Sequence, residues 1–173
     1  MSVPLSSKRL APTVFYGVAL TITILDQLVK ALVRVKMPVG TSIPLWPGVF
    51  ELEHVQNDGI AFSMLAGKTW MITLASIAIM IAIVLSERRA KGGVERFPGV
   101  ALALALGGAL GNLIDRLFRH GLVTDFLYFK AINFPIFNLA DSAISIGICL
   151  LAIRSFFFSE FPRETTKLVP EES

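Results

Sequence analysis

The sequence predicts an all-α membrane protein with four transmembrane helices and a small extracytoplasmic β element that lies on the membrane surface. Of its 173 residues, 54% are hydrophobic and only 17% are charged, whereas soluble domains carry about 25% charged residues. A soluble fold of this length has too much surface to hide so much apolar sequence. Four apolar stretches approach the roughly 20 residues that cross a bilayer core. They lie at about 13–33, 69–85, 98–117 and 137–158.

The predicted membrane part is one domain. Residues 1–158 are expected to fold as a single four-helix transmembrane domain, and the charged tail 159–173, with its two prolines, is expected to be disordered in the cytoplasm. The first apolar stretch is too long for a cleavable signal peptide, and no small-residue cleavage site follows it. We therefore interpret it as a retained helix. The one cysteine, Cys149, can form no internal disulfide.

Basic residues predict the orientation of the helices, because cytoplasmic loops are enriched in Lys and Arg. They cluster at the amino end, in the second loop and in the tail: Lys8, Arg9, Arg88, Arg89, Lys91, Arg96, Arg163 and Lys167. Arg34 and Lys36 weaken this bias without reversing it. Both termini are therefore expected inside, and residues 35–68 and 119–135 outside. The net charge of +3 fits this placement better than a nucleic-acid-binding face.

The first outside segment, about 38–62, predicts the β element. Its beginning contains turn-forming residues: Pro38, Gly40, Pro44, Pro47 and Gly48. Further on, Phe50 and Leu52 alternate with Glu51 and Glu53, a pattern typical of a strand with one apolar face. Trp46 and Phe50 are expected to rest that face on the bilayer, as interfacial aromatic residues do.

Polar residues inside the apolar stretches need a reason, because a charge at the bilayer centre costs roughly 3 kcal/mol on insertion scales. In the first stretch, Asp26 and Lys30 are four residues apart and share a helix face. We interpret them as a structural ion pair in preference to direct chemistry. Asn57 and Gly59 follow the predicted strand; alone they indicate no more than a turn that leads into a helix.

The third stretch combines small and polar residues. Gly107 and Gly111 form a small-xxx-small pattern, which predicts close helix packing. Asn112 and Asp115 are three residues apart and Arg116 follows, so polar groups gather toward the outer end of this helix. Arg116 is expected to reach the interface or to pair with a carboxylate.

Two further acidic residues flank a short connection at the same expected depth. Asp125 lies just beyond the third stretch, and Asp141 lies in the first turn of the fourth. Singly, Asp125 reads as a turn residue and Asp141 as a charge favoured at a helix N-terminus. With Asn112, Asn138 and Arg116 at similar depth, we instead predict that the two carboxylates meet.

Such a pair could hydrolyse a peptide bond. Two carboxylates about 3 Å apart share one proton, so one can activate water while the other protonates the leaving amine. The pair titrates as a unit, which leaves open which aspartate holds the proton. This chemistry requires no metal and no cofactor. The sequence has no zinc-binding His-Glu-x-x-His or Gly-x-Ser-x-Gly motif, and His54 and His120 are expected to be surface or interfacial residues.

In order along the chain, these motifs resemble those of the lipoprotein signal peptidases (signal peptidase II). The resemblance covers all four stretches. It rests on Asp26-Gln27-x-x-Lys30, Asn57-x-Gly59-x-Ala61-Phe62, Gly107-Gly108-Ala109-x-Gly111-Asn112-x-x-Asp115-Arg116, Val123-x-Asp125-Phe126 and Phe137-Asn138-x-Ala140-Asp141.

The resemblance implies an aspartic endopeptidase of the bacterial cytoplasmic (inner) membrane, with its site near the outer leaflet. It implies cleavage of diacylglyceryl-modified prolipoproteins on the amino side of the lipidated cysteine, and inhibition by globomycin. Asp125 and Asp141 match the catalytic dyad. Other matched positions bind substrate or support the dyad: Asn57, Gly59, Gly108, Asn112, Asp115, Arg116, Asn138, Asp26 and Lys30. The expected partners are the substrate and membrane lipids, not nucleic acid, and the expected state is a monomer.

Two other classes of function stay open at this stage. Intramembrane aspartates can relay protons in a proton-coupled carrier, although the second stretch has few polar residues beyond Thr69, Thr73 and Ser76. A non-catalytic membrane scaffold could use Gly107 and Gly111 to pack against a partner. Replacement of Asp125 or Asp141 by asparagine distinguishes the three functions, because only a peptidase would then accumulate uncut prolipoprotein.

Overall fold

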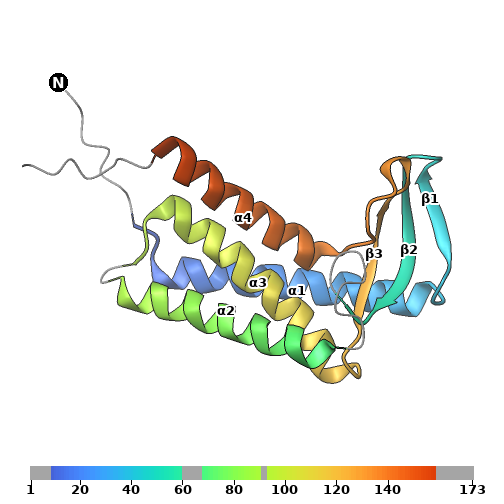
Figure 1. Ribbon diagram of the computed structural model, residues 1–173, viewed down its shortest axis with the longest axis horizontal. Helices are drawn as coiled ribbons and strands as arrows, with labels where there is room; N and C mark the ends of the chain where they lie inside the picture. The colour runs from blue at the N-terminus through green and yellow to red at the C-terminus, as the bar shows by residue number, and fades with distance from the viewer. Residues whose placement is uncertain (1–8, 60–67, 91–92, 159–173) are drawn as a thin grey trace, which may run out of the picture.

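The computed structural model describes residues 9–59, 68–90 and 93–158, in which four long helices lie beside one another and a small sheet stands at one end of them (Figure 1). The expected β residues 60–62 and the tail 159–173 lie outside the described residues. In chain order the elements are α1 (Pro12–Lys36), β1 (Ser42–Trp46), β2 (Phe50–Asn57), α2 (Thr69–Arg89), α3 (Arg96–Phe118), β3 (Val123–Phe129), the 3₁₀ turn η2 (Lys130–Ile132) and α4 (Leu139–Phe158).

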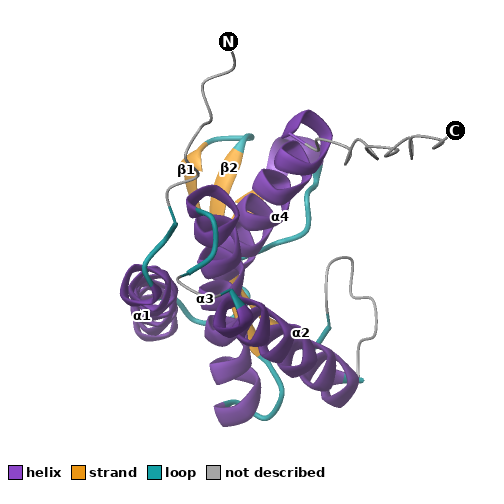
Figure 2. Ribbon diagram, turned by 90° about the vertical axis from the view of Figure 1, so that its left-hand side faces the viewer, coloured by secondary structure: helices purple, strands orange, loops and turns teal. Residues whose placement is uncertain are grey.

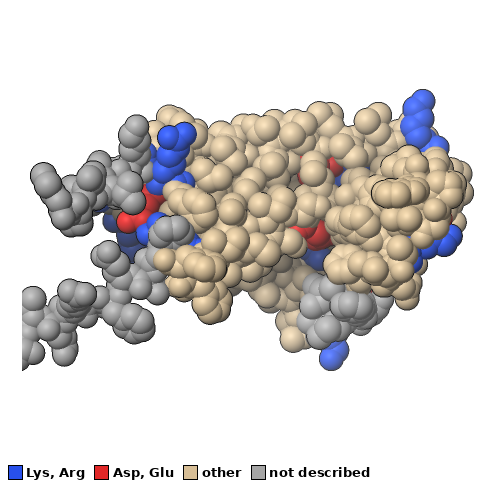
Figure 3. All heavy atoms as spheres, turned by 90° about the horizontal axis from the view of Figure 1, so that it is seen from above, with Lys and Arg blue, Asp and Glu red and all other residues tan. Residues whose placement is uncertain are grey.

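Helix α3 is the centre of the helical part, with α1, α2 and α4 each packed against it (Figure 2). Its buried residues are small or apolar for most of its length, which allows three neighbours to approach one helix. Large apolar side chains remain exposed on the outer faces of the helices, for example Leu20, Leu74 and Ile148. On the face drawn in Figure 3, charged groups gather toward the two ends and an uncharged band lies between them.

Among the described residues, three helices are long and apolar enough to cross a membrane: α2, α3 and α4. This confirms a mostly helical protein of membrane composition with a small sheet. Helix α1 has 25 residues but carries Asp26 and Lys30 on its buried face. Its role as a fourth span therefore stays a prediction.

Close packing between α1 and α3 depends on glycine. A Cβ atom at Gly107 would lie 2.5 Å from the carbonyl oxygen of Ala19, and one at Gly111 would lie 2.5 Å from Asp26 Oδ2. Both distances are far below van der Waals contact. The small-xxx-small pattern therefore allows α1 to pack on α3 of the same chain.

The sheet is antiparallel, in the order β1-β2-β3. Strand β2 pairs Phe50 with Phe129 at one end and Asn57 with Val123 at the other. Strand β3 was not predicted from the sequence, which placed Asp125 only in the connection between the third and fourth apolar stretches. The segment is extended because β2 supplies its hydrogen-bonding partner, and a local pattern cannot reveal a partner so distant in the chain.

The position of His54 differs from the one expected from the sequence. It was expected at the surface, but its side chain is only 2% exposed, and Nδ1 lies 2.7 Å from the carbonyl oxygen of Met37. The pairing of β2 with β3 shifts between Leu52 and Val55. Such a bulge breaks the simple alternation of faces along a strand. His120 is exposed, as expected.

We predict that Gly107→Ala lowers the stability of the protein by about 1–3 kcal/mol, because the added methyl group must displace the backbone of α1. Gly17→Ala is the matched control, since a Cβ there meets nothing within 4 Å. Thermal unfolding in detergent measures both variants. Equal unfolding temperatures would contradict the packing role of Gly107.

Candidate functional site

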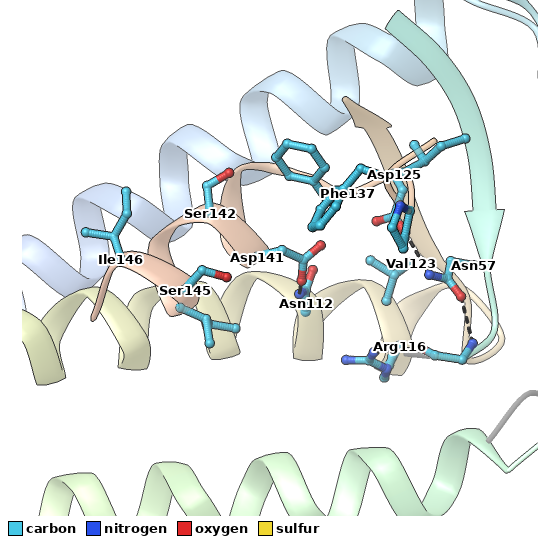
Figure 4. A pocket seen from close by; sticks show the side chains of 15 residues that line it. Asn57, Asn112, Arg116, Val123, Asp125, Phe137, Asp141, Ser142, Ser145 and Ile146 are labelled. Atoms are coloured by element: carbon cyan, nitrogen blue, oxygen red, sulfur yellow. Dashed lines mark hydrogen bonds between the residues drawn. The ribbon is translucent and has the colours of Figure 1, made fainter. Parts of the chain in front are cut away.

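A pocket of about 470 Å³ lies where β2 and β3 meet the ends of α3 and α4. One part of its lining is polar: Asn57, Asn112, Arg116, Asp125 and Asp141. The other part is mostly apolar and includes Val123, Phe134, Pro135, Ile136, Phe137, Ile144 and Ile146. Figure 4 shows Asp125 and Asp141 entering this pocket from different elements.

Asn138 joins the two aspartates. Its side-chain nitrogen donates a hydrogen bond to Asp125 Oδ1 at 2.6 Å, and its backbone nitrogen donates to Asp141 Oδ2 at 3.2 Å. Asp125 comes from β3 and is 2% exposed. Asp141 comes from the first turn of α4. One fully buried asparagine therefore fixes the carboxylates of two different elements relative to each other.

Asn138 and Asp141 also begin helix α4. The side-chain oxygen of Asn138 accepts the backbone N–H of Asp141 at 2.9 Å, while Asp141 accepts the backbone N–H of Asn138. This reciprocal pair is a capping box, which satisfies two N–H groups that the first helical turn leaves free. It explains why α4 begins at Leu139 and not at the expected residue 137.

Two more asparagines complete the hydrogen bonding of the carboxylates. Asn57 Nδ2 donates to Asp125 Oδ2 at 2.8 Å, and Asn112 Nδ2 donates to Asp141 Oδ1 at 2.7 Å. Together with the bonds from Asn138, every carboxylate oxygen of the pair accepts one hydrogen bond. The two carboxylates are thus held in fixed orientations before any ligand binds.

A buried ion-pair cluster lies behind this pocket. Lys30 Nζ contacts Asp26 Oδ2 at 2.8 Å and Asp115 Oδ2 at 3.4 Å, and all three side chains are 0% exposed. The ion pair expected from the spacing of Asp26 and Lys30 is therefore confirmed. Lys30 also donates to Asn112 Oδ1 at 2.8 Å, which turns the amide nitrogen of Asn112 toward Asp141.

The acidic members of this cluster hold the elements that carry the aspartates of the pocket. Asp26 Oδ1 accepts the backbone N–H of Ala140 at 3.0 Å, in the first turn of α4. Asp115 Oδ2 accepts the backbone N–H of Thr124 at 3.1 Å, one residue before Asp125. Asp26, Lys30 and Asp115 therefore lie outside the pocket lining and support it from behind. Gly108 also lies outside the lining. Its lack of a side chain lets α4 approach α3, because a Cβ atom there would overlap the backbone of Ala140.

Gly59 and Arg116 line the pocket, as does Asn57. Arg116 Nη2 lies 3.4 Å from the carbonyl oxygen of Gly59. Its Nε is buried and has no hydrogen-bond partner within residues 9–59, 68–90 and 93–158. The pocket thus presents a cationic donor beside two carboxylates.

Burial, and after it the nearby negative charge of Asp141, raise the pKa of Asp125 to about 7. The hydrogen bonds from Asn57 and Asn138 oppose this shift because they stabilise the carboxylate. Asp125 consequently keeps a proton up to about neutral pH.

Sequence reasoning missed the apolar wall of the pocket. Residues 134 and 135 were treated as the end of an outside connection, yet Phe134 and Pro135 line the pocket together with Ile136. A usable signal was present, because these residues form an apolar run directly before Asn138 in a segment expected outside the membrane.

Together the fold and the site define a helical membrane protein with a carboxylate pair in a pocket at the sheet end of its helices. The family described as Signal peptidase (SPase) II matches residues 18–157. The chain belongs to the signal peptidase II family, and this confirms the resemblance found in the sequence.

Curated relatives agree with this assignment. The lipoprotein signal peptidase of Geobacillus kaustophilus is 43% identical over 147 residues, covering 84% of this chain and 94% of that protein. The lipoprotein signal peptidase of Bacillus subtilis is 44% identical over 142 residues, covering 81% and 91%. A bacterial membrane enzyme solved by the in meso method at 2.3 Å resolution has a TM-score of 0.78 and 30% identity, covering 96% of this chain and 98% of that one.

We predict that Lys30→Met destabilises the fold by about 3–5 kcal/mol, because it leaves the buried carboxylate of Asp26 without its cation. Lys36→Met serves as the control, since Lys36 is exposed at the end of α1. Thermal unfolding of the two variants in the same detergent compares them. A loss of stability no greater for Lys30→Met than for Lys36→Met would refute the role given to Lys30.

Proposed function

We propose that the chain removes signal peptides from diacylglyceryl-modified bacterial prolipoproteins by cleavage on the amino side of the lipidated cysteine. Membership of the signal peptidase II family supports the reaction. The observation that carries its chemistry is the placement of Asp125 and Asp141 in one pocket, joined through Asn138.

In the proposed mechanism, the aspartate pair works with one shared proton. The ionised carboxylate removes a proton from water as the water attacks the scissile carbonyl carbon. The protonated carboxyl donates a hydrogen bond to the carbonyl oxygen, and a carboxylic acid then protonates the leaving amine. The raised pKa of Asp125 supports this sharing, because it keeps a proton in the pocket at neutral pH.

The remaining polar residues hold the pair and the peptide. Asn57, Asn112 and Asn138 keep the carboxylates oriented through the hydrogen bonds described above. Arg116 has donor capacity beyond its bond to Gly59, and we assign it to a carbonyl oxygen of the bound peptide. Asp26, Lys30, Asp115 and Gly108 act by supporting these groups.

We place the sheet end of the molecule at the outer leaflet and both termini in the cytoplasm. Helix α1 is long enough to be the fourth span, and it packs on α3 beside the apolar helices. In Figure 3, acidic groups are visible in a hollow between the uncharged band and the sheet end. An apolar signal peptide would reach this hollow laterally, through the lipid bilayer. The enzyme would act as a monomer, and globomycin-type inhibitors would occupy the same pocket.

We expect Asp125→Asn and Asp141→Asn each to lower the rate of cleavage by roughly 100-fold to 10,000-fold, because each removes a proton-transfer group. Purified protein and a diacylglyceryl-modified lipobox peptide provide the assay, with thermal unfolding as the check on folding. Glu53→Gln removes a carboxylate outside the pocket lining and is expected to cleave normally. Full activity of a folded Asn variant would rule out the dyad.

The pH dependence provides a further prediction. The pKa of about 7 for Asp125 in the free protein predicts that kcat/KM falls as pH rises through neutrality, because the pair loses its shared proton. Asn57→Leu removes a hydrogen bond that stabilises the carboxylate of Asp125. The pKa of Asp125 should then rise, and the falling limb of the kcat/KM profile should move to higher pH. A limb that stays in place or moves to lower pH would contradict this assignment.

A further inference from the structure

An ion pair on the sheet connects three segments. Glu51 Oε1 on β2 lies 2.7 Å from Lys130 Nζ, at the beginning of η2. The other carboxylate oxygen of Glu51 accepts the hydroxyl of Ser42 on β1 at 2.7 Å. The side chain of Glu51 is 9% exposed and that of Lys130 is 52% exposed. Glu51 thus connects both strands of the hairpin to the turn that follows β3.

Both members of this pair remain charged at neutral pH. The hydrogen bond from Lys130 is the main cause that lowers the pKa of Glu51, and the same bond is the main cause that raises the pKa of Lys130. A carboxyl pKa below its usual range and an amine pKa above its usual range each favour the charged form. The pair is therefore intact over the whole neutral range.

The turn after Lys130 is a compact reversal of the chain. Asn133 adopts the left-handed conformation, with φ of 48°, and its backbone N–H donates to the carbonyl oxygen of Lys130 at 3.0 Å. The hydroxyl of Tyr128 donates to the side-chain oxygen of Asn133 at 2.7 Å, and the backbone N–H of Phe134 donates to Phe129 at 3.1 Å. These bonds make the turn one unit, so Lys130 anchors it as a whole.

Aromatic rings connect this turn to the pocket. Phe50 on β2 packs on Phe129 at a centroid distance of 4.9 Å, and Phe129 stacks on Phe137 at 5.7 Å. Phe134 meets the same Phe137 edge to face at 5.7 Å. Phe134 and Phe137 both line the pocket, and Phe134 is 45% exposed.

The two ends of the apolar wall are held differently. Phe137 exchanges backbone hydrogen bonds with Leu127 at 2.8 and 3.0 Å, directly before Asn138 and the capping box. Phe134 begins the wall at its other end, where the turn and the Glu51–Lys130 pair hold the chain. Release of the pair would therefore loosen residues 134–136 while Asn138, Asp125 and Asp141 keep their own hydrogen bonds.

We propose that Glu51 and Lys130 are positioning residues for the substrate: through the turn and Phe134 they fix the apolar wall against which the bound lipopeptide lies. This inference rests on the proposed function and adds a determinant of substrate affinity outside the pocket. Because the pair does not touch the carboxylates of the dyad, its loss should change KM and leave kcat nearly unchanged.

The test uses the full chain with the diacylglyceryl-modified lipobox peptide. Glu51→Gln and Lys130→Gln should each raise KM about threefold to tenfold, with kcat within about twofold of the wild type. Lys130→Arg keeps the charge and should preserve most of the affinity. Glu53→Gln is the matched control, because Glu53 is a half-buried carboxylate of the same strand without a salt bridge among the described residues.

A double-mutant cycle tests the route through Phe134. Phe134→Ala should raise KM by itself, and the addition of Glu51→Gln should then have little further effect, because both changes act on one wall. Additive effects on KM would show that the pair acts elsewhere and would overturn the proposal, as would unchanged KM values in Glu51→Gln and Lys130→Gln. A parallel fall in kcat would also overturn it. Failure of the wild-type protein to cleave the peptide would instead refute the proposed function itself.

Discussion

The arrangement of this protein depends on one lysine that is buried among helices. Lys30 has no exposed surface, and a buried cation is tolerated only with partners close by. Its partners come from α1 and α3, and they in turn bind the beginnings of β3 and α4 through Thr124 and Ala140. Satisfying one charge therefore brings together the elements that carry Asp125 and Asp141.

The polar residues of the site stabilise the fold and also orient the proposed dyad. Asp141 caps the helix on which it lies and is also one of the two candidate catalytic groups. Asn138 caps the same helix and binds Asp125. An arrangement of this kind keeps the reacting groups rigid, because the interactions that position them are the same ones that begin the helix. Preorganised groups need little rearrangement when the transition state forms.

Local patterns predicted the parts of this structure that depend on short sequence distances. The pairing of Asp26 with Lys30 follows from helical spacing, and the placement of Asp141 follows from its position in a first helical turn. Strand β3 could not be predicted in this way, because Asn57 and Asp125 are 68 residues apart in the chain. His54 was misplaced because a bulge interrupts β2. The proximity of Asp125 and Asp141 was expected, and both line one pocket, but the apolar wall beside them could be recognised only in three dimensions.

The pocket draws on both halves of the chain, and this has a consequence for biosynthesis. Asn57 is made first, Asn112 and Asp125 follow, and Asp141 belongs to the last helix. A ribosome-bound chain that lacks α4 holds a single aspartate of the pair and has no Asn138 to orient it. The pocket is therefore complete only after α4 has been synthesised and has packed on α3.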